Sequence, residues 1–255
     1  MKTIMQSKEI NIEDIKSIAI KAGDIIMEIY KKDFSIDYKD DKSPLTQADL
    51  KSNELICSEL NRLYPNIPIM SEENKQIPYE ERKDWEYYFC IDPIDGTKEF
   101  IKKNDEFTVN IALIKNNTPI MGVVYAPALN ELYWADGINS YKNNEKLPLF
   151  INKNPKENLF VVASKSHLSV ETQEFIDKLD SKNIEQISKG SSLKLCMVAE
   201  GIAHIYPRLA PTMEWDTAAA DAIVRCAGKM TYQYENNKPM VYNKEDLLNP
   251  WFVVR

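Results

Sequence analysis

Five apolar segments between residues 66 and 135 have the composition of β-strands and follow one another at short intervals. They are NIPIM (66–70), EYYFCI (86–91), FTVNIALIK (107–115), PIMGVVYAP (119–127) and ELYWA (131–135). β-Branched and aromatic residues are frequent in them, and Pro, Asn, Asp or Gly stand close to most of their ends, as is typical of strands that end in turns. This run predicts that strands dominate the middle of the chain.

Helical patterns precede these strands. Residues 12 to 31 carry apolar side chains at helical spacing, namely Ile12, Ile15, Ile18, Ala22, Ile25 and Ile29. A second helix is expected from Thr46, which begins the capping-box-like sequence TQAD, to about Leu63. Its inward-facing residues are expected to be Leu50, Ile56, Leu60 and Leu63.

The last hundred residues have a different rhythm. The strand-like segments NLFVVAS, NIEQIS and AHIYPR alternate with the helix-like segments ETQEFIDKL, SSLKLCMVAE and TAAADAIVRCAG. Such alternation is typical of an α/β unit. The polar region from Lys142 to Asn158 is the candidate boundary, so we expect a mixed α and β protein with halves at 1–150 and 151–255.

Composition excludes several classes of function. The 255 residues carry a net charge of −7, which argues against binding to nucleic acid or to an acidic membrane surface. A small anionic substrate remains compatible with this balance, provided that a few Lys and Arg residues or metal ions supply local positive charge. Two histidines are too few for a His-rich zinc site, and the Rossmann, P-loop and GxSxG motifs are missing.

The chain also carries no signal for a membrane or an oxidising compartment. No run of about 18 apolar residues occurs, and the N-terminus MKTIMQSKEINIED has no apolar signal core. The four cysteines, Cys57, Cys90, Cys196 and Cys226, are scattered and are expected to be reduced thiols of the core. We expect a cytoplasmic protein, with a peripheral place at the inner membrane as the alternative.

Acidic residues stand at the ends of several predicted elements. Glu72 follows a strand in SEEN, Asp92 and Asp95 follow the next strand in DPIDGT, and Asp49 and Asp216 lie near helix starts. Each has an ordinary structural explanation. Asp216 would serve as a helix N-cap, Asp49 would complete a capping box, and Glu72 would lie in a solvated loop.

The segment DPIDGT is the hardest of these to explain by structure alone. Its composition suits a turn. However, Pro93 stiffens the backbone between two carboxylates that repel each other unless a cation or a proton intervenes, and Gly96 permits close approach. Oxygen ligands, to which the Ile94 carbonyl would add one, suit Mg²⁺ or Mn²⁺ rather than zinc. From spacing alone, a turn and a metal site fit equally well.

Taken together, SEEN, DPIDGTKEF and EWDTAAADAI resemble the three signature motifs of the inositol monophosphatase superfamily, and TQAD matches a further motif. These enzymes are magnesium-dependent, lithium-sensitive phosphomonoesterases. The motifs occur in the family order between Thr46 and Ile223. From Gly190, the segment GSSLKLCMVAEGIAHIYPRLAPTMEWDTAAADAI resembles the bacterial 3′(2′),5′-bisphosphate nucleotidase branch. The resemblance implies a layered αβαβα sandwich with its site between the two halves.

The resemblance also implies roles for the acidic residues. One magnesium ion would be held by Glu72, Asp92 and the Ile94 carbonyl, and a second by Asp92, Asp95 and Asp216. A third, weaker ion would lie near Glu72. Thr97 and Asp49 would orient and deprotonate the attacking water. The backbone of Asp95, Gly96 and Thr97 would face the scissile phosphate, with Glu72 and Asp216 also at the substrate.

Four residues of the second half would contact the nucleotide by the same resemblance. They are His167 in VASKSH, Ser191 and Lys194 in GSSLK, and Arg208 in YPRL. Each also has a structural explanation, because His167 would suit an exposed loop, Ser191 a helix cap, and Lys194 and Arg208 the surface. In an acidic protein, however, Lys194 and Arg208 are good candidates for neutralising a second phosphate.

The expected activity is therefore hydrolysis of 3′-phosphoadenosine 5′-phosphate (PAP) to AMP and phosphate, as part of sulfur assimilation and PAP recycling. Two alternatives remain open: an inositol or sugar phosphatase, and a metal- and nucleotide-binding protein without turnover. The expected partner is the small nucleotide bisphosphate alone, bound by a monomer or a homodimer.

Overall fold

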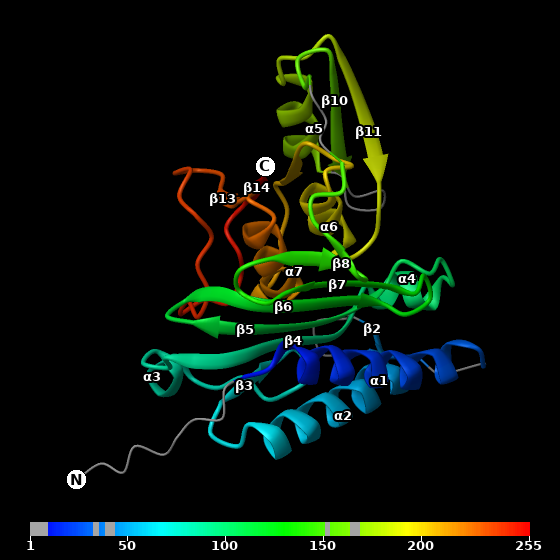
Figure 1. The fold of residues 1–255 in the computed structure, drawn as a ribbon, viewed down its shortest axis with the longest axis vertical. Helices are drawn as coiled ribbons and strands as arrows, with labels where there is room; N and C mark the ends of the chain where they lie inside the picture. The colour runs from blue at the N-terminus through cyan, green and yellow to red at the C-terminus, as the bar shows by residue number, and fades with distance from the viewer. Residues whose placement is uncertain (1–9, 33–35, 39–43, 151–153, 164–168) are drawn as a thin grey trace.

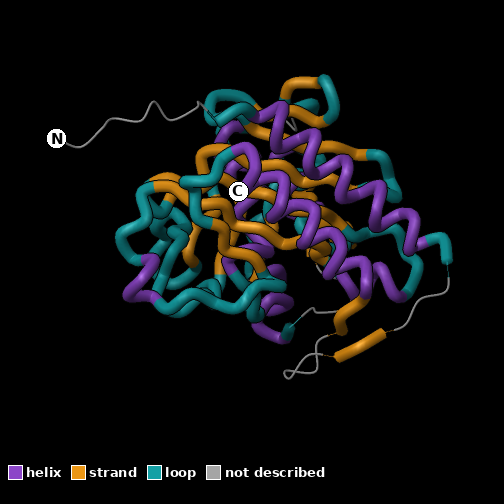
Figure 2. The backbone as a smooth tube through the Cα atoms, turned by 90° about the horizontal axis from the view of Figure 1, so that it is seen from below, coloured by secondary structure: helices purple, strands orange, loops and turns teal. Residues whose placement is uncertain are grey.

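Two long helices, a large sheet and a second stack of helices and strands form successive layers in the computed structural model (Figure 1). It describes residues 10–32, 36–38, 44–150, 154–163 and 169–255. The first layer consists of α1 (Ile12–Tyr30) and α2 (Gln47–Leu63), which lie beneath the sheet in Figure 1 and side by side in front of it in Figure 2. Both helices agree with the predicted ones.

The second layer is a seven-stranded sheet. In spatial order its strands are β3 (Ile69–Ser71), β4 (Tyr87–Asp95), β5 (Thr108–Lys115), β6 (Thr118–Ala126), β7 (Glu131–Ala135), β8 (Ser140–Lys142) and β9 (Glu145–Lys146). Only β3 and β4 pair in parallel, and the other neighbours pair antiparallel. The five predicted strands are confirmed, and β8 and β9 extend the sheet beyond them.

Above this sheet lie α6 (Leu193–Glu200) and α7 (Glu214–Cys226), followed by a second β-layer and then α5 (Val170–Asp177). Its strands are β10 (Asn158–Ala163), β11 (Asn183–Ser188), β12 (Tyr206–Arg208), β13 (Thr231–Gln233) and β14 (Phe252–Val254). β10 pairs in parallel with β11, and β14 lies between β12 and β13. A bridge between Val161 and Ile205 joins the two groups. The predicted mixed, layered αβαβα architecture is confirmed.

Short elements complete the chain. They are β1 (Ile36–Tyr38), β2 (Pro44–Thr46), α3 (Tyr79–Arg82) and α4 (Thr97–Ile101). None was predicted, since each has only three to five residues. In the described part of the chain, no helix has both the length and the apolar character needed to cross a bilayer.

Two apolar clusters fill the spaces on either side of the seven-stranded sheet. One is formed with α1 and α2, and the other includes residues of α6, α7 and the C-terminal strands. The expectation that Leu50 points inward is wrong, because its side chain is 49% exposed. The buried face of α2 instead follows Asp49, Ser52, Ile56 and Leu60. Two of these four residues are polar, so apolar periodicity alone could not locate the face at its N-terminal end.

Candidate active site

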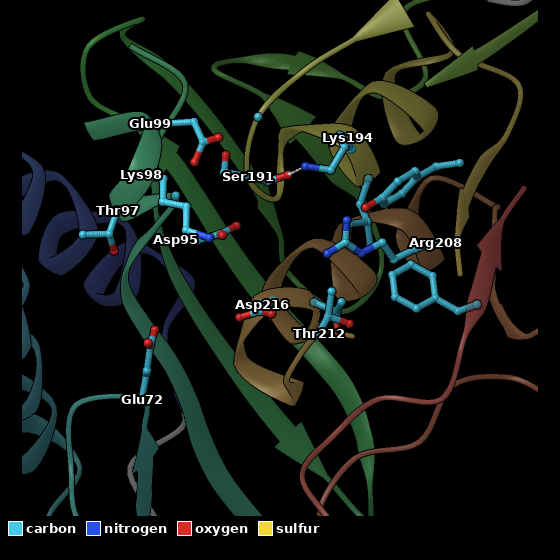
Figure 3. A pocket seen from close by; sticks show the side chains of 16 residues that line it. Glu72, Asp95, Thr97, Lys98, Glu99, Ser191, Lys194, Arg208, Thr212 and Asp216 are labelled. Carbon is cyan, nitrogen blue, oxygen red and sulfur yellow. Dashed lines mark hydrogen bonds between the residues drawn. The ribbon is translucent and has the colours of Figure 1, made fainter. Parts of the chain in front are cut away.

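A cavity opens where elements of both halves of the chain meet. It is lined by residues near the ends of β3 and β4, by α4, and by residues at the starts of α6 and α7 and in β12. Acidic side chains stand on one side of the cavity, and Lys194 and Arg208 on the other (Figure 3). Twelve residues were expected at the site, and those that line this cavity are Glu72, Asp95, Gly96, Thr97, Ser191, Lys194, Arg208 and Asp216.

The DPIDGT segment continues the strand instead of following it. β4 runs through Asp95, and its pairing with β5 shifts register between Asp92 and Asp95, which marks a bulge. The Ser52 hydroxyl, from α2, donates a 3.0 Å hydrogen bond to the Pro93 carbonyl inside this bulge. Gly96 then adopts φ +91° and leads into α4. The bulge places both carboxylates at one end of the sheet.

Each of three carboxylates is held in place through one of its oxygens. Asp92 Oδ1 accepts from the Ile94 N–H at 3.0 Å, and Asp216 Oδ2 accepts from the Met213 N–H at 2.8 Å. Asp95 Oδ2 lies 2.7 Å from the Ser192 hydroxyl oxygen. The backbone and neighbouring side chains therefore set the orientation of the carboxylates before any substrate is considered.

Burial and mutual repulsion raise the pKa values of these acids. The pKa of Asp92 rises well above the ordinary value because of burial first and the charges of Glu72, Asp95 and Asp216 second. The pKa of Asp216 rises to about 8 because of burial and then the charge of Asp95. A side-chain hydrogen bond also links Asp92 and Glu72. A cluster of this kind requires either protons or a cation to offset its negative charge.

Asp49 and Thr97 form a second polar contact at the edge of the acidic side. The Thr97 Oγ1 lies 3.2 Å from Asp49 Oδ1 and 3.3 Å from the Ile94 carbonyl oxygen. Asp49 Oδ2 accepts from both the N–H and the hydroxyl of Thr46, at 2.8 and 2.6 Å. The capping box expected at Thr46 is present. Burial nevertheless raises the pKa of Asp49, although its hydrogen bonds to Thr46 and Thr97 oppose the rise.

The opposite side of the cavity has donors without acceptors. Among buried atoms in the described residues, the Ser191 hydroxyl and Arg208 Nε have no hydrogen-bond partner. Lys194 is only 8% exposed, and its Nζ donates a 2.6 Å hydrogen bond to the Ser191 carbonyl. Burial lowers the pKa of Lys194 to about 8. Unsatisfied buried donors beside a buried cation are typical of an anion-binding site.

Known proteins match this chain over nearly its whole length. The sequence matches the model of the inositol monophosphatase family over residues 7–250. The chain belongs to the inositol monophosphatase family. It is 42% identical over 246 residues to the 3′(2′),5′-bisphosphate nucleotidase CysQ of Shigella flexneri, and this alignment covers 95% of this chain and 98% of that protein. The CysQ of Haemophilus influenzae is 34% identical over 247 residues, covering 95% and 91%.

Solved structures of the inositol monophosphatase family share this fold. A crystal structure of CysQ from Bacteroides thetaiotaomicron superposes with a TM-score of 0.86 at 44% identity, covering 97% of this chain and 98% of that one. The inositol monophosphatase of Thermotoga maritima superposes with a TM-score of 0.76 at 23% identity, covering 95% and 91%. The second likeness shows the fold alone.

Enzymes of the inositol monophosphatase family depend on metal ions, typically Mg²⁺. The donor chemistry of the acidic side fits this ion, because Glu72, Asp92, Asp95 and Asp216 offer only oxygen and are short of positive charge. In the described ranges, no three acidic, thiol or imidazole side chains are arranged closely enough to hold one ion as they stand.

Several site residues could instead have served as helix caps or surface charges, and the structure tests these roles for three of them. The N-cap of α6 is Ser192 rather than Ser191, and Asp216 stands at the third position of α7, whose N-cap is Met213. Lys194 is buried, so it is not a surface charge. His167 lies outside the described residues.

Sequence reasoning missed two residues that contact the acidic side. Ser192 is 1% exposed, and its hydroxyl lies between Asp95 Oδ2 and the Asp216 carbonyl oxygen, 2.7 Å from each. Asn110, in β5, donates a 2.8 Å hydrogen bond to the Ser192 oxygen. Neither residue type is distinctive in a strand or helix start, so no sequence signal identified them.

Proposed function

We propose that this chain is a magnesium-dependent phosphomonoesterase that hydrolyses PAP to AMP and phosphate. The observation that carries the proposal is the division of one cavity into an acidic side and a side with unsatisfied donors at Ser191 and Arg208. A substrate with two phosphates suits that division. The scissile phosphate would lie at the acidic side, and the other would be bound by Ser191, Lys194 and Arg208. The CysQ relatives have the matching activity in their name.

The acidic residues would hold the metal ions in two overlapping sets. Glu72, Asp92 and the Ile94 carbonyl would form one set, and Asp92, Asp95 and Asp216 the other. A third, weaker ion would lie near Glu72. When bound, Mg²⁺ would offset the charge of the phosphate and lower the pKa of a coordinated water. In this arrangement residues 1–150 supply most ligands, and residues 151–255 supply Asp216 and the nucleotide contacts.

Asp49 and Thr97 would act as the proton-accepting pair. The Thr97 hydroxyl is already directed at Asp49, which is buried and has a raised pKa, so this carboxylate is a stronger base than an exposed Asp. Thr97 would orient the attacking water, and the proton that this water loses would pass toward Asp49. Gly96 and the Thr97 N–H at the start of α4 would face the phosphate oxygens. Backbone groups would make this contact, and the absence of a side chain on Gly96 would leave space for the phosphate.

The test is phosphate release from PAP with Mg²⁺, with and without Li⁺. We expect turnover by the wild-type protein, inhibition by Li⁺, and a loss of at least about a hundredfold in Asp95→Asn, since metal affinity depends on that carboxylate. Asp180→Asn removes the same charge at an exposed position and should leave activity unchanged. Equal activity in Asp95→Asn would contradict the metal assignment.

The same assay with other substrates separates the related activities. We expect kcat/KM for PAP to exceed that for inositol 1-phosphate and fructose 1,6-bisphosphate, because neither of these offers a nucleotide 5′-phosphate to Lys194 and Arg208. A preference for inositol 1-phosphate would identify an inositol phosphatase instead. Tight PAP binding without phosphate release would identify a protein that binds the nucleotide only.

A further inference from the structure

Glu106 lies between two glycines that belong to different walls of the cavity. A Cβ atom placed on Gly190, just before α6, would lie 2.8 Å from both the Cβ and the backbone oxygen of Glu106. A Cβ placed on Gly96, at the start of α4, would lie 3.2 Å from the same backbone oxygen. The distances at Gly190 leave no room for a side chain, and the distance at Gly96 is tighter than an ordinary contact, so Glu106 is packed directly against both loops. Glu106 itself does not line the cavity.

The Glu106 side chain is also bonded to the turn that precedes α6. Its Oε2 accepts a 2.8 Å hydrogen bond from the Gly190 N–H, and its Oε1 lies 3.3 Å from the Lys189 ammonium group. The Glu106 N–H is in turn bonded to the Asn104 side chain at 3.1 Å. The bond to Gly190 has an ionised acceptor, so it is stronger than a bond between neutral groups.

This turn determines the position of one of the unsatisfied donors, the Ser191 hydroxyl. Ser191, the next residue, has φ +47°, a conformation that residues other than glycine adopt only when their surroundings hold them there. Its hydroxyl has no partner, and its carbonyl accepts from Lys194 Nζ at 2.6 Å. The contacts of Glu106 with Lys189 and Gly190 are therefore made immediately beside a backbone conformation that needs support.

We infer that Glu106 is a positioning residue that makes the site selective for substrates with a second phosphate. It holds the Gly190–Ser191 turn at a fixed separation from the Gly96 loop, so that both phosphates of one molecule meet their binding groups together. Fixing two groups in advance lowers the entropy cost of binding a ligand that needs both. This inference rests on the proposed function, which places the non-scissile phosphate at the turn.

A purely electrostatic role for Glu106 predicts the opposite result. Its carboxylate is negative and raises the pKa of Lys194, so it lies close enough to repel a phosphate bound there. If charge alone mattered, removal of the carboxylate would strengthen binding of a 5′-phosphate at about pH 6.5, where Lys194 stays protonated with or without Glu106, so AMP binding is compared at that pH. If Glu106 positions the turn, its removal weakens that binding. The sign of the change therefore separates the two roles.

The experiment compares ligands that carry one phosphate each. AMP carries only the 5′-phosphate, and its affinity is measured by calorimetry in the presence of Mg²⁺. 3′-AMP carries only the scissile phosphate, and its hydrolysis is measured as kcat/KM. In Glu106→Ala we expect AMP affinity to fall about tenfold, the scale set by the loss of a hydrogen bond to an ionised group. Hydrolysis of 3′-AMP should stay unchanged.

Two further variants serve as controls. Glu106→Gln keeps an oxygen that accepts from the Gly190 N–H, so its AMP affinity should stay within about threefold of wild type. Glu157→Ala removes a comparable ion pair, with Lys182, on the outer surface and should change neither measurement. Thermal unfolding of each variant shows whether it is folded at the assay temperature.

Several outcomes overturn the inference. They are tighter AMP binding in both Glu106 variants, no change in either, equal losses for AMP and 3′-AMP, and failure of the wild-type protein to bind AMP. The proposed function fails separately. If the wild-type protein binds AMP, and loses that binding in Glu106→Ala, yet releases no phosphate from PAP, the turn is correctly assigned and the hydrolytic activity is not.

Discussion

Lys194 shows at the scale of one residue how burial prepares a charge for a ligand. Its ammonium group is nearly covered by protein, and burial is the largest influence on its pKa. The charges of Asp95, Glu99 and Glu106 raise that pKa, whereas burial and the charge of Arg208 lower it. The balance leaves the pKa of Lys194 at about 8, far closer to neutral pH than the pKa of an exposed lysine.

This balance predicts that AMP binding depends on pH. Below about pH 8 Lys194 is protonated and attracts the 5′-phosphate, and as the pH rises through this value the charge and part of the affinity are lost. Calorimetry between about pH 6.5 and 9.5 should therefore show weaker AMP binding at the alkaline end. Lys194→Arg stays protonated throughout this range and should lack the decline. The same decline in that variant would show that another group titrates.

Residues that contact only other residues could not be found in the sequence. Asp92 and Asp95 stand in a motif whose composition indicates chemistry, and Lys194 was expected at the site because GSSLK resembles a motif of the family. Ser192 and Asn110 act through hydrogen bonds that join positions 95, 110, 192 and 216, and such contacts exist only after the chain has folded. Glu106 belongs to the same group, since its contact with Gly190 spans 84 positions.

At the scale of elements, the contact between β6 and α7 holds the two halves of the cavity together. Gly122 lies in β6 where it faces Ala219 and Ala222 of α7. A Cβ atom on Gly122 would lie only 2.2 Å from the Ala219 backbone oxygen. The helix therefore rests directly on the strand, and the small residues TAAADA in α7 permit that approach. Asp216, at the start of α7, is placed by this packing.

The close approach predicts that Gly122→Ala is strongly destabilising. The clash is with helix backbone, which cannot rotate away, so we expect a loss of about 3 kcal/mol in the free energy of unfolding, at the upper end for overpacked cores. Gly23→Ala, in α1, is the matched comparison. Its new Cβ would meet the Tyr125 ring, a side chain that has some freedom to move, and alanine also favours the helix. Denaturant unfolding should rank Gly122→Ala as the more destabilised, and the reverse order would contradict the argument.

Periodicity predicted most elements, and local hydrogen bonds explain the boundaries it missed. The strand expected to end at residue 91 continues through a bulge to Asp95, where Ser52 supports the backbone. The helix expected from residue 217 begins at Glu214, because Asp216 accepts from the Met213 N–H. In both cases, polar residues that were expected to lie outside an element belong to it. Acidic side chains interrupt the apolar pattern at these points.

At the scale of the whole molecule, the cavity is lined by residues that are far apart in the sequence, from position 72 to position 252. Glu72, Asp95 and Thr97 come from the first half, and Lys194, Arg208 and Asp216 from the second. Repulsion among the carboxylates opposes the folded arrangement, while an anion at Lys194 and Arg208 would favour it. The charge of the site and the stability of the fold are therefore linked through its ligands.

We accordingly expect Mg²⁺ and AMP to raise the thermal unfolding temperature, and to raise it further when they are added together. A ligand at a hundred times its Kd stabilises a protein by about 2.7 kcal/mol, which for a chain of this size corresponds to an increase of roughly 5–10 °C. Chelation with EDTA should reverse the part of the temperature increase that Mg²⁺ causes. In Asp95→Asn the response to Mg²⁺ should shrink while the response to AMP remains, because Lys194 and Arg208, the proposed 5′-phosphate contacts, lie on α6 and β12. A full magnesium response in that variant would place the ion away from Asp95.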